Sequence, residues 1–202
     1  SSDLHDLKWT NVTNNPHFTN STSVNIKIFR SLTLSPGMDY NYGGTITFES
    51  VETGNTILTN GHTLLNNIIF DGISGEWTLM DDLSVVGDIF LNYGNLLTND
   101  LSFTCHNFSS STTNERVLFL GNSNLFINGS WNINSTNLTF DAGTSILTIA
   151  GGIFNSGEVE LTYNVIFFQS GSSTVNNAGA YVRYDSLLFS GGGILFGDCK
   201  IV

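Results

Sequence analysis

The chain has 202 residues and a formal net charge of -11, and Asn, Ser, Thr and Gly together fill 91 of its positions. Ala, Gln, Glu, Lys and Met sum to only 16 residues, so the helix formers of an all-helical or doubly wound α/β fold are missing. Six scattered cations make no basic face, which argues against nucleic acid as a partner, and no apolar run approaches the roughly 18 residues of a membrane span.

Short apolar runs with period-2 alternation recur along the chain and predict β-strands. In chain order these runs are residues 26–28, 46–48, 68–70, 89–91, 125–127, 165–167 and 187–189. Further apolar pairs lie between them, at Leu32/Leu34, Trp77/Leu79, Leu83/Val85, Leu101/Phe103, Leu138/Phe140 and Val159/Leu161. Asn-Gly, Asp-Gly and Gly-Gly pairs separate the runs and indicate turns that need a positive φ.

Equivalent apolar positions recur every 18 to 22 residues, a spacing obtained by subtracting successive residue numbers. The series is Ile28, Ile46, Ile68, Ile89, Phe108, Ile127, Ile146, Val165 and Leu187. Antiparallel hairpins repeat about every 8 to 12 residues, whereas one coil of a β-solenoid takes about 20. We therefore predict an all-β, right-handed parallel β-solenoid (β-helix) of about 9–10 coils, roughly 19–22 residues per coil, with a β-sandwich as the alternative.

The composition does not change along the chain, so residues 1–202 are predicted to form a single β-solenoid domain in which 1–25 are an irregular or capping segment. Asn is suited to the corners of such a stack, because its amide can bond to the next coil and its backbone tolerates the left-handed region.

Three segments resemble a known class of repeats. They are Gly75-Glu76-Trp77-Thr78-Leu79, then Asp82-Leu83-Ser84-Val85-Val86-Gly87-Asp88-Ile89, then Ala142-Gly143-Thr144-Ser145-Ile146-Leu147-Thr148-Ile149. These phrases resemble the β-solenoid repeat regions of large secreted bacterial and viral surface proteins of the adhesin type. The resemblance is best over residues 44–152. It implies secretion and a scaffold or adhesive role, and it assigns no site residue.

Stacked coils make a stiff rod whose length scales with the number of repeats. We therefore expect a non-enzymatic structural segment of an extracellular fibre, filament or adhesin at a cell or virion surface, assembling through end-to-end or lateral contacts. Its expected partners are other copies, further coils of a longer chain, or surface glycans. The alternative is a glycan-binding module or a lyase-like or hydrolase-like β-helix enzyme acting on polysaccharide. No catalytic, cofactor-binding or metal-binding residue is assigned, and no cofactor is expected.

Asp81 and Asp82, beside Asp88 and Asp100, are the best candidates for the paired carboxylates that cleave a glycosidic bond. Adjacent residues of a strand, however, point to opposite faces. Gly61-His62-Thr63 also departs from the Gly-His-Gly element of pectinase-like hydrolases. We interpret these acids as solvated turn residues and predict that the chain is not an enzyme.

The histidines His5, His17, His62 and His106 show none of the close His spacings that zinc sites commonly use. Asp3, His5 and Asp6 are interpreted as a frayed polar end rather than a metal site. Arg116 is expected to pair with Glu115, Asp100 or a backbone carbonyl.

The tyrosines allow two interpretations, a strip of exposed rings that stack on sugars, or packing in the core and corners, which we favour. They are Tyr40, Tyr42, Tyr93, Tyr163, Tyr181 and Tyr184. The Asn-x-Ser/Thr sequons occur at about their chance number for this composition, so they do not indicate glycosylation.

Cys105 and Cys199 are separated by four to five predicted coils, on the order of 22 Å, so no disulfide between them is expected. Residues 7–12 and 193–202 have the pattern of strands at the two ends of the chain. Because open strand edges invite pairing, we predict that neighbouring copies or further coils cover both terminal coils. The alternative is a monomer whose first 20 residues fold over one end.

Overall fold

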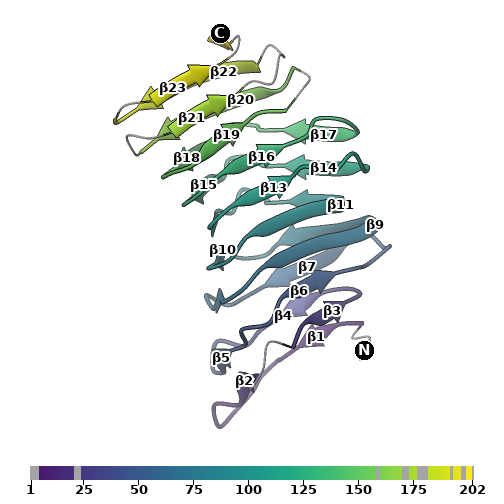
Figure 1. The fold of residues 1–202 in the computed structure, drawn as a ribbon. Helices are drawn as coiled ribbons and strands as arrows, with labels where there is room; N and C mark the ends of the chain where they lie inside the picture. The colour runs from purple at the N-terminus through teal and green to yellow at the C-terminus, as the bar shows by residue number, and fades with distance from the viewer. Residues whose placement is uncertain are drawn as a thin grey trace.

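The computed structural model describes residues 5–20, 24–157, 160–169, 173–176, 182–191, 193–196 and 199–201. Over these ranges every regular element is a β-strand, and the strands pair in parallel. The chain coils as a β-solenoid of about eight turns with about 22 residues per turn, from the N-terminus at the bottom of Figure 1 to the C-terminus at its top. The predicted parallel β-solenoid is therefore confirmed.

Two large sheets and one small sheet contain the described strands. The larger sheet holds β1 (Leu7–Lys8), β3 (Ile26–Ile28), β4 (Leu32–Thr33), β6 (Ile46–Phe48), β7 (Asn55–Leu58), β9 (Ile68–Leu79), β11 (Ile89–Leu97), β13 (Phe108–Ser110), β14 (Arg116–Phe119), β16 (Trp131–Ile133), β17 (Leu138–Asp141), β19 (Ile153–Asn155), β21 (Ser173–Asn176) and β23 (Gly193–Phe196). The second holds β8 (Thr63–Leu64), β10 (Leu83–Val85), β12 (Phe103–Cys105), β15 (Asn124–Ile127), β18 (Ile146–Ile149), β20 (Thr162–Phe168), β22 (Val182–Phe189) and β24 (Cys199–Ile201). The small sheet pairs β2 (His17–Thr19) with β5 (Asp39–Asn41).

Each central turn contributes one strand to each of three faces. The first face stacks β13, β16 and β19, the second stacks β14 and β17, and the third stacks β8, β10, β12, β15, β18 and the C-terminal halves of β20 and β22. In β9 and β11 a single long strand covers both the first and the second face, and the register between them shifts around Tyr93 where the strands bend. Gly94 sits in that bend with φ +76°, and a Cβ there would lie 2.6 Å from the carbonyl oxygens of Gly72 and Gly75, so only glycine fits.

The number of turns is smaller than the sequence series suggested, for a reason visible in the register. Phe108 pairs with Trp131 on the first face, 23 positions later (131 minus 108), whereas Ile127 lies on the third face and pairs with Ile149. The step of 19 residues from Phe108 to Ile127 therefore measures part of one turn. Because that step was treated as a whole coil, the sequence predicted nine or ten coils, whereas the structure has about eight.

The core is a set of inward-facing rows in which each side chain contacts its equivalent in the next turn. On the third face the row Phe103, Leu125, Leu147 and Ile166 is buried throughout. On the first face Phe108 stacks on Trp131 with ring centroids 4.4 Å apart. Full burial of one such side chain contributes about 1.5–3 kcal/mol, so the repeated rows carry most of the stability of the fold.

Polar side chains join successive turns at the corner between the third and first faces. The Asn67 side-chain oxygen accepts the Asp88 backbone N–H at 2.9 Å, and Asp88 accepts that of Asn107 at 3.0 Å. Asn107 in turn accepts the N–H of Ser130 at 2.7 Å, and Ser130 Oγ accepts that of Ile153 at 3.0 Å. The corner is therefore a column of hydrogen bonds along the solenoid axis, as the abundance of Asn led us to expect.

Candidate functional site

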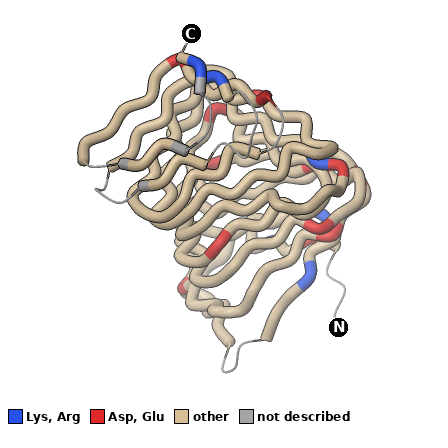
Figure 2. Tube along the Cα trace, turned by 45° about the horizontal axis from the view of Figure 1, so that its top comes forward, with Lys and Arg blue, Asp and Glu red and all other residues tan. Residues whose placement is uncertain are grey.

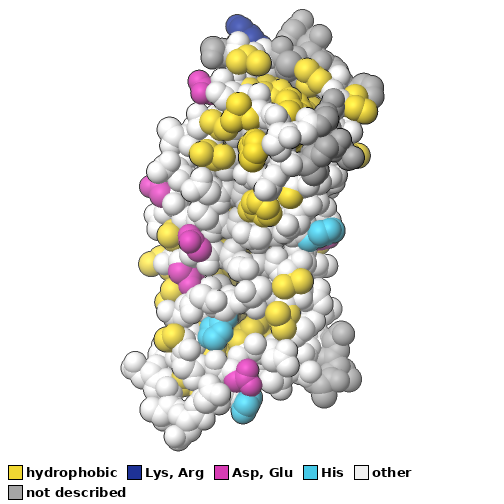
Figure 3. All heavy atoms as spheres, turned by 90° about the vertical axis from the view of Figure 1, so that its left-hand side faces the viewer, with side chains coloured by type: hydrophobic (Ala, Val, Ile, Leu, Met, Phe, Trp, Pro, Cys, Tyr) yellow, Lys and Arg dark blue, Asp and Glu magenta, His cyan; other side chains and the backbone are white. Residues whose placement is uncertain are grey.

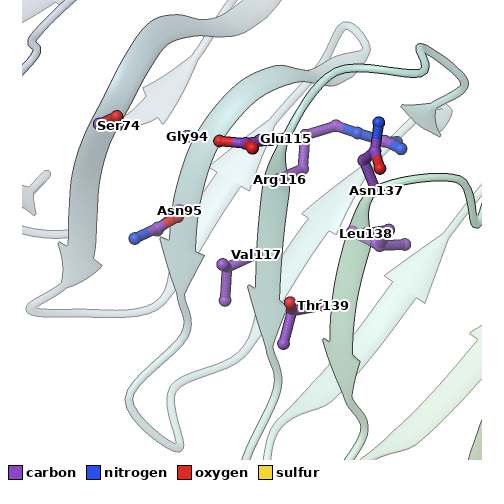
Figure 4. A pocket seen from close by; sticks show the side chains of 9 residues that line it. All are labelled: Ser74, Gly94, Asn95, Glu115, Arg116, Val117, Asn137, Leu138 and Thr139. Carbon is purple, nitrogen blue, oxygen red and sulfur yellow. The ribbon is translucent and has the colours of Figure 1, made fainter.

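An open groove of about 480 Å3 runs across the outside of the second face, where β11, β14 and β17 stack (Figure 4). It is lined by Ser74, Gly94, Asn95, Glu115, Arg116, Val117, Asn137, Leu138 and Thr139. The register places Asn95, Val117 and Thr139 in one outward row, with neighbours about 4.8 Å apart. The groove therefore offers amides, hydroxyls and one carboxylate, Glu115, to a polar ligand.

The Arg116 side chain runs toward Asn137 (Figure 4), and the residue is only 2% exposed. Its guanidinium donates to the Asn114 carbonyl (2.9 Å), to the Ser110 carbonyl and Oγ (2.5 and 2.7 Å), and to the carbonyls of Asn134 (2.9 Å) and Thr136 (2.6 Å). Burial lowers the pKa of the guanidinium from its ordinary value. The backbone carbonyls, one of the three partners expected from the sequence, are thus its partners.

The position of those carbonyls gives Arg116 a structural role. Ser110 and Asn114 belong to the corner of its own turn, whereas Asn134 and Thr136 belong to the corner of the next turn. One side chain thereby joins two successive corners, and of its acceptors the Ser110 carbonyl also accepts the backbone N–H of Asn134 at 2.8 Å. The sequence marked Arg116 as an isolated cation but contained no signal for this corner geometry.

A second groove of about 450 Å3 lies between β17 and the start of β20 and β22. It is lined by Phe140, Asp141, Ala142, Gly143, Glu160, Leu161, Thr162, Tyr163, Asn164, Arg183 and Asp185. Glu160 and Arg183 form an ion pair between their exposed side chains. Sequence reasoning did not select Asp141, Glu160 or Asp185, because only the register, which sets Arg183 beside Thr162, brings them to one place.

The four carboxylates proposed as the best catalytic candidates are hydrogen-bond acceptors between turns. Asp81 accepts from the backbone N–H groups of Thr59 and Gly61 (2.8 and 3.1 Å). Asp82 accepts from Ser102 N (2.8 Å), Asp88 from Asn107 N (3.0 Å), and Asp100 from Asn122 N (2.7 Å). Asp88 lies at the corner between the third and first faces, and the other three lie between the second and third. These acids are therefore turn residues, as we interpreted them, with a specific bonding role.

The histidines lie apart in the described part of the chain. His17 Nδ1 contacts Asp39 at 2.6 Å, His62 Nε2 contacts the Ser35 carbonyl at 2.8 Å, and His106 Nδ1 contacts Asp88 at 3.1 Å. The ring of His5 lies near that of Phe29, with ring centroids 6.5 Å apart. Over the described residues, no group of three or more His, Cys, Asp and Glu side chains is arranged to hold a metal ion.

The N-terminal polar segment is joined to the solenoid at Asp6. Its carboxylate accepts the backbone N–H of Ser31 at 3.0 Å and contacts the Lys8 ammonium at 3.3 Å. The hydrogen bond from Ser31 is the main reason that the pKa of Asp6 is lowered. Our interpretation of a frayed end is therefore wrong at Asp6, while Asp3 lies outside the described residues.

The tyrosines pack inward rather than forming a strip of exposed rings. Tyr42, Tyr163 and Tyr184 are buried, and Tyr40 and Tyr93 are half-buried. The Tyr163 hydroxyl accepts the indole N–H of Trp131 at 3.2 Å. Burial raises the pKa of Tyr40 and of Tyr163 above the ordinary value. Tyr181 lies outside the described residues, and the packing interpretation is confirmed for the others.

Cys105 is free and buried, and burial raises the pKa of its thiol. Its strand, β12, is separated from β24, which begins at Cys199, by five steps in the sheet, or about 24 Å. A disulfide needs Cα atoms within about 7 Å, so the parallel register keeps these two positions apart, as predicted.

Comparison of the chain with protein-family models, with curated proteins and with solved structures gives no match. In the described ranges no helix has the length and apolar character needed to cross a membrane. The function must therefore be inferred from the surfaces of the solenoid itself.

Proposed function

We propose that this chain is a structural rod segment of an extracellular fibre, filament or adhesin. The observation that carries the proposal is the continuity of the core, whose inward rows run from Ile28 near the first turn to Tyr184 near the last. About eight turns at roughly 4.8 Å each make a stack about 38 Å long. Adding turns lengthens such a rod without changing its cross-section, which is the mechanical property that a fibre needs.

The last described turn supports end-to-end assembly. Phe189 and Leu195 occupy inward-facing positions, yet they are 40% and 45% exposed. Their partners in the preceding turn, Phe168 and Val175, are buried. In this proposal a neighbouring copy or further coils of a longer chain cover these residues and continue the parallel ladder.

An extracellular setting agrees with the composition and with the adhesin-like repeat phrases. Stability comes from stacked rows and corner hydrogen bonds, and Asn, Ser and Thr provide much of the outer surface. The acidic net charge keeps copies soluble until specific contacts bring them together.

Negative-stain electron microscopy of the purified chain, with sedimentation velocity at micromolar concentration, tests the rod proposal. We expect unbranched rods of constant width and species larger than one chain. A compact monomer alone, at every concentration measured, would contradict assembly.

The polar groove on the second face favours one other candidate function, glycan binding. Asn95 and Thr139 lie in one outward row, and Glu115 supplies an acceptor for sugar hydroxyls. Binding to a panel of polysaccharides, with and without calcium, tests this candidate. Asn95→Ala with Glu115→Ala should abolish a true groove interaction, whereas the matched control Asp82→Asn, at a corner outside the groove, should leave it unchanged. Cleavage that is lost in Asp82→Asn would instead indicate an enzyme.

A further inference from the structure

The outer side of the third face carries a row of apolar residues on its C-terminal strands. Phe126, Ile146, Val165, Phe167 and Leu188 point outward from β15, β18, β20 and β22, and we name these five residues the apolar strip. Phe126, Thr148, Phe167 and Leu188 form one row, and Ile146 and Val165 lie in the parallel row beside it. The strip is thus a flat, regularly spaced surface.

These side chains are distinct from the core. Their chain neighbours Leu147 and Ile166 point inward and are buried, whereas Ile146 is 41% and Leu188 50% exposed. Figure 3, which faces this side of the molecule, shows hydrophobic side chains gathered in its upper, C-terminal part. Exposed apolar surface of this kind marks a contact site when it is contiguous.

The strip is also free of charge in a strongly acidic chain. Residues 142–157, 161–182 and 186–197 contain no Lys, Arg, Asp or Glu, although the net charge is -11. Figure 2 shows the same feature as long uncharged stretches of the trace between isolated charged residues. Two copies that approach through most other surfaces bring carboxylates together, whereas contact through this strip avoids that repulsion.

We propose that the apolar strip binds the apolar strip of a second copy of this chain, and this inference rests on the rod function proposed above. The strands of two such faces pack about 10 Å apart with their side chains interleaved. A two-fold axis through the centre of the strip sets Phe126 against Leu188 of the partner subunit. The same axis sets Ile146 against Val165 of the partner subunit, so that one surface is complementary to itself.

Sedimentation equilibrium of the purified chain tests the contact. We expect a dimer, and Ile146→Asp with Leu188→Asp should weaken it at least 100-fold, because the pair places four carboxylates in one apolar interface. The matched control is Ser84→Asp with Thr104→Asp, two outward positions on the N-terminal strands of the same face, and it should leave the dimer intact. Circular dichroism of both variants should retain the wild-type strand signal and a cooperative melt.

Mixing two oppositely charged variants tests the two-fold arrangement. Chains carrying Ile146→Asp are mixed with chains carrying Val165→Lys, because the axis sets these two positions against each other. In sedimentation equilibrium we expect a heterodimer in the mixture and much weaker association in either sample alone, since only the mixture pairs the two charges. A wild-type dimer that the Asp pair dissociates, together with no gain of association in the mixture, would overturn the two-fold arrangement.

The outcomes separate this inference from the rod function. A wild-type chain that stays monomeric at 100 µM, or a dimer that resists the Asp pair, would overturn the strip as a contact between copies. Pelleting of that monomer with an insoluble polysaccharide, lost in the Asp pair, would assign the strip to a glycan instead. If the Asp pair still forms rods, but only as single, unpaired filaments, the result would support the apolar strip as a lateral contact between copies. If the wild-type chain forms strip-dependent dimers but no rods, the result would refute the rod function and leave the contact through the strip intact.

Discussion

The outer side of the third face differs between its N-terminal and its C-terminal strands, whereas the inner side is apolar along its whole length. Along the N-terminal strands the outward row is Thr63, Ser84 and Thr104, in which the Thr63 hydroxyl donates to Ser84 Oγ at 3.3 Å. From β15 onward the same row continues as Phe126, Thr148, Phe167 and Leu188. The inner rows remain apolar through both regions. The inner rows therefore specify the solenoid, and the outer rows are free to specify what it contacts.

Arg116 lies between the two regions, and its removal should have the largest effect on stability. Arg116→Met removes the donor to the carbonyls of Asn114, Asn134 and Thr136, whereas the Ser110 carbonyl keeps the backbone N–H of Asn134. Because a hydrogen bond to a charged group contributes about 1.5–3 kcal/mol and water reaches some of the freed carbonyls, we expect a loss of about 4 kcal/mol. Urea unfolding followed by circular dichroism measures this loss. Arg116→Lys should recover only part of it, since an ammonium lacks the planar fork, and full recovery would refute the proposed geometry.

A pair of adjacent substitutions in β18 separates the inner from the outer rows. Leu147→Ala opens a cavity in the core and should cost about 3 kcal/mol. Ile146→Ala, one position away on the apolar strip, should change the stability of the monomer by no more than about 0.5 kcal/mol. Unfolding is measured at a concentration where the chain is monomeric. Equal losses would mean that the outer row belongs to the core after all.

The division between inward and outward rows was largely predictable from the sequence, because the inward rows repeat the same residue types at a spacing of one turn. The series failed at Phe108 and Ile127, where both residues are apolar but belong to different faces. Period-2 alternation indicates which side chains of a strand point toward the core and which point outward, but it does not indicate which of the three faces the strand belongs to.

The candidate surfaces were less predictable than the fold. The grooves and the apolar strip join residues about 20 positions apart, so they exist only once the register is fixed. The same holds for Arg116, whose acceptors are backbone carbonyls of two corners and leave no mark in the sequence. The residue types alone could thus suggest a rod, but they could not identify the surfaces through which the rod contacts other molecules.

Two tyrosines with raised pKa values, Tyr40 toward the N-terminus and Tyr163 toward the C-terminus, should make the protein less stable in alkali. In the unfolded chain tyrosine ionises near pH 10, whereas burial holds the pKa of Tyr163 and Tyr40 higher in the folded state. Above about pH 10 the unfolded state therefore binds fewer protons, and stability falls as the pH rises. The slope is at most about 1.4 kcal/mol per pH unit for each group. Unfolding free energies measured between pH 8 and 11 should show this fall, and Tyr163→Phe should make it shallower.

The smallest expected effect distinguishes the hydroxyls of those two tyrosines. The Tyr40 hydroxyl is buried and has no hydrogen-bond partner in the described structure, whereas that of Tyr163 accepts from Trp131. Tyr40→Phe removes a polar group that gains nothing from burial, so we expect unchanged stability or a gain of up to about 1 kcal/mol at neutral pH. Tyr163→Phe leaves the indole N–H of Trp131 without its acceptor and should cost about 1 kcal/mol. Parallel urea titrations at pH 7 measure both, and a loss in Tyr40→Phe as large as that in Tyr163→Phe would show that the Tyr40 hydroxyl is bonded in solution.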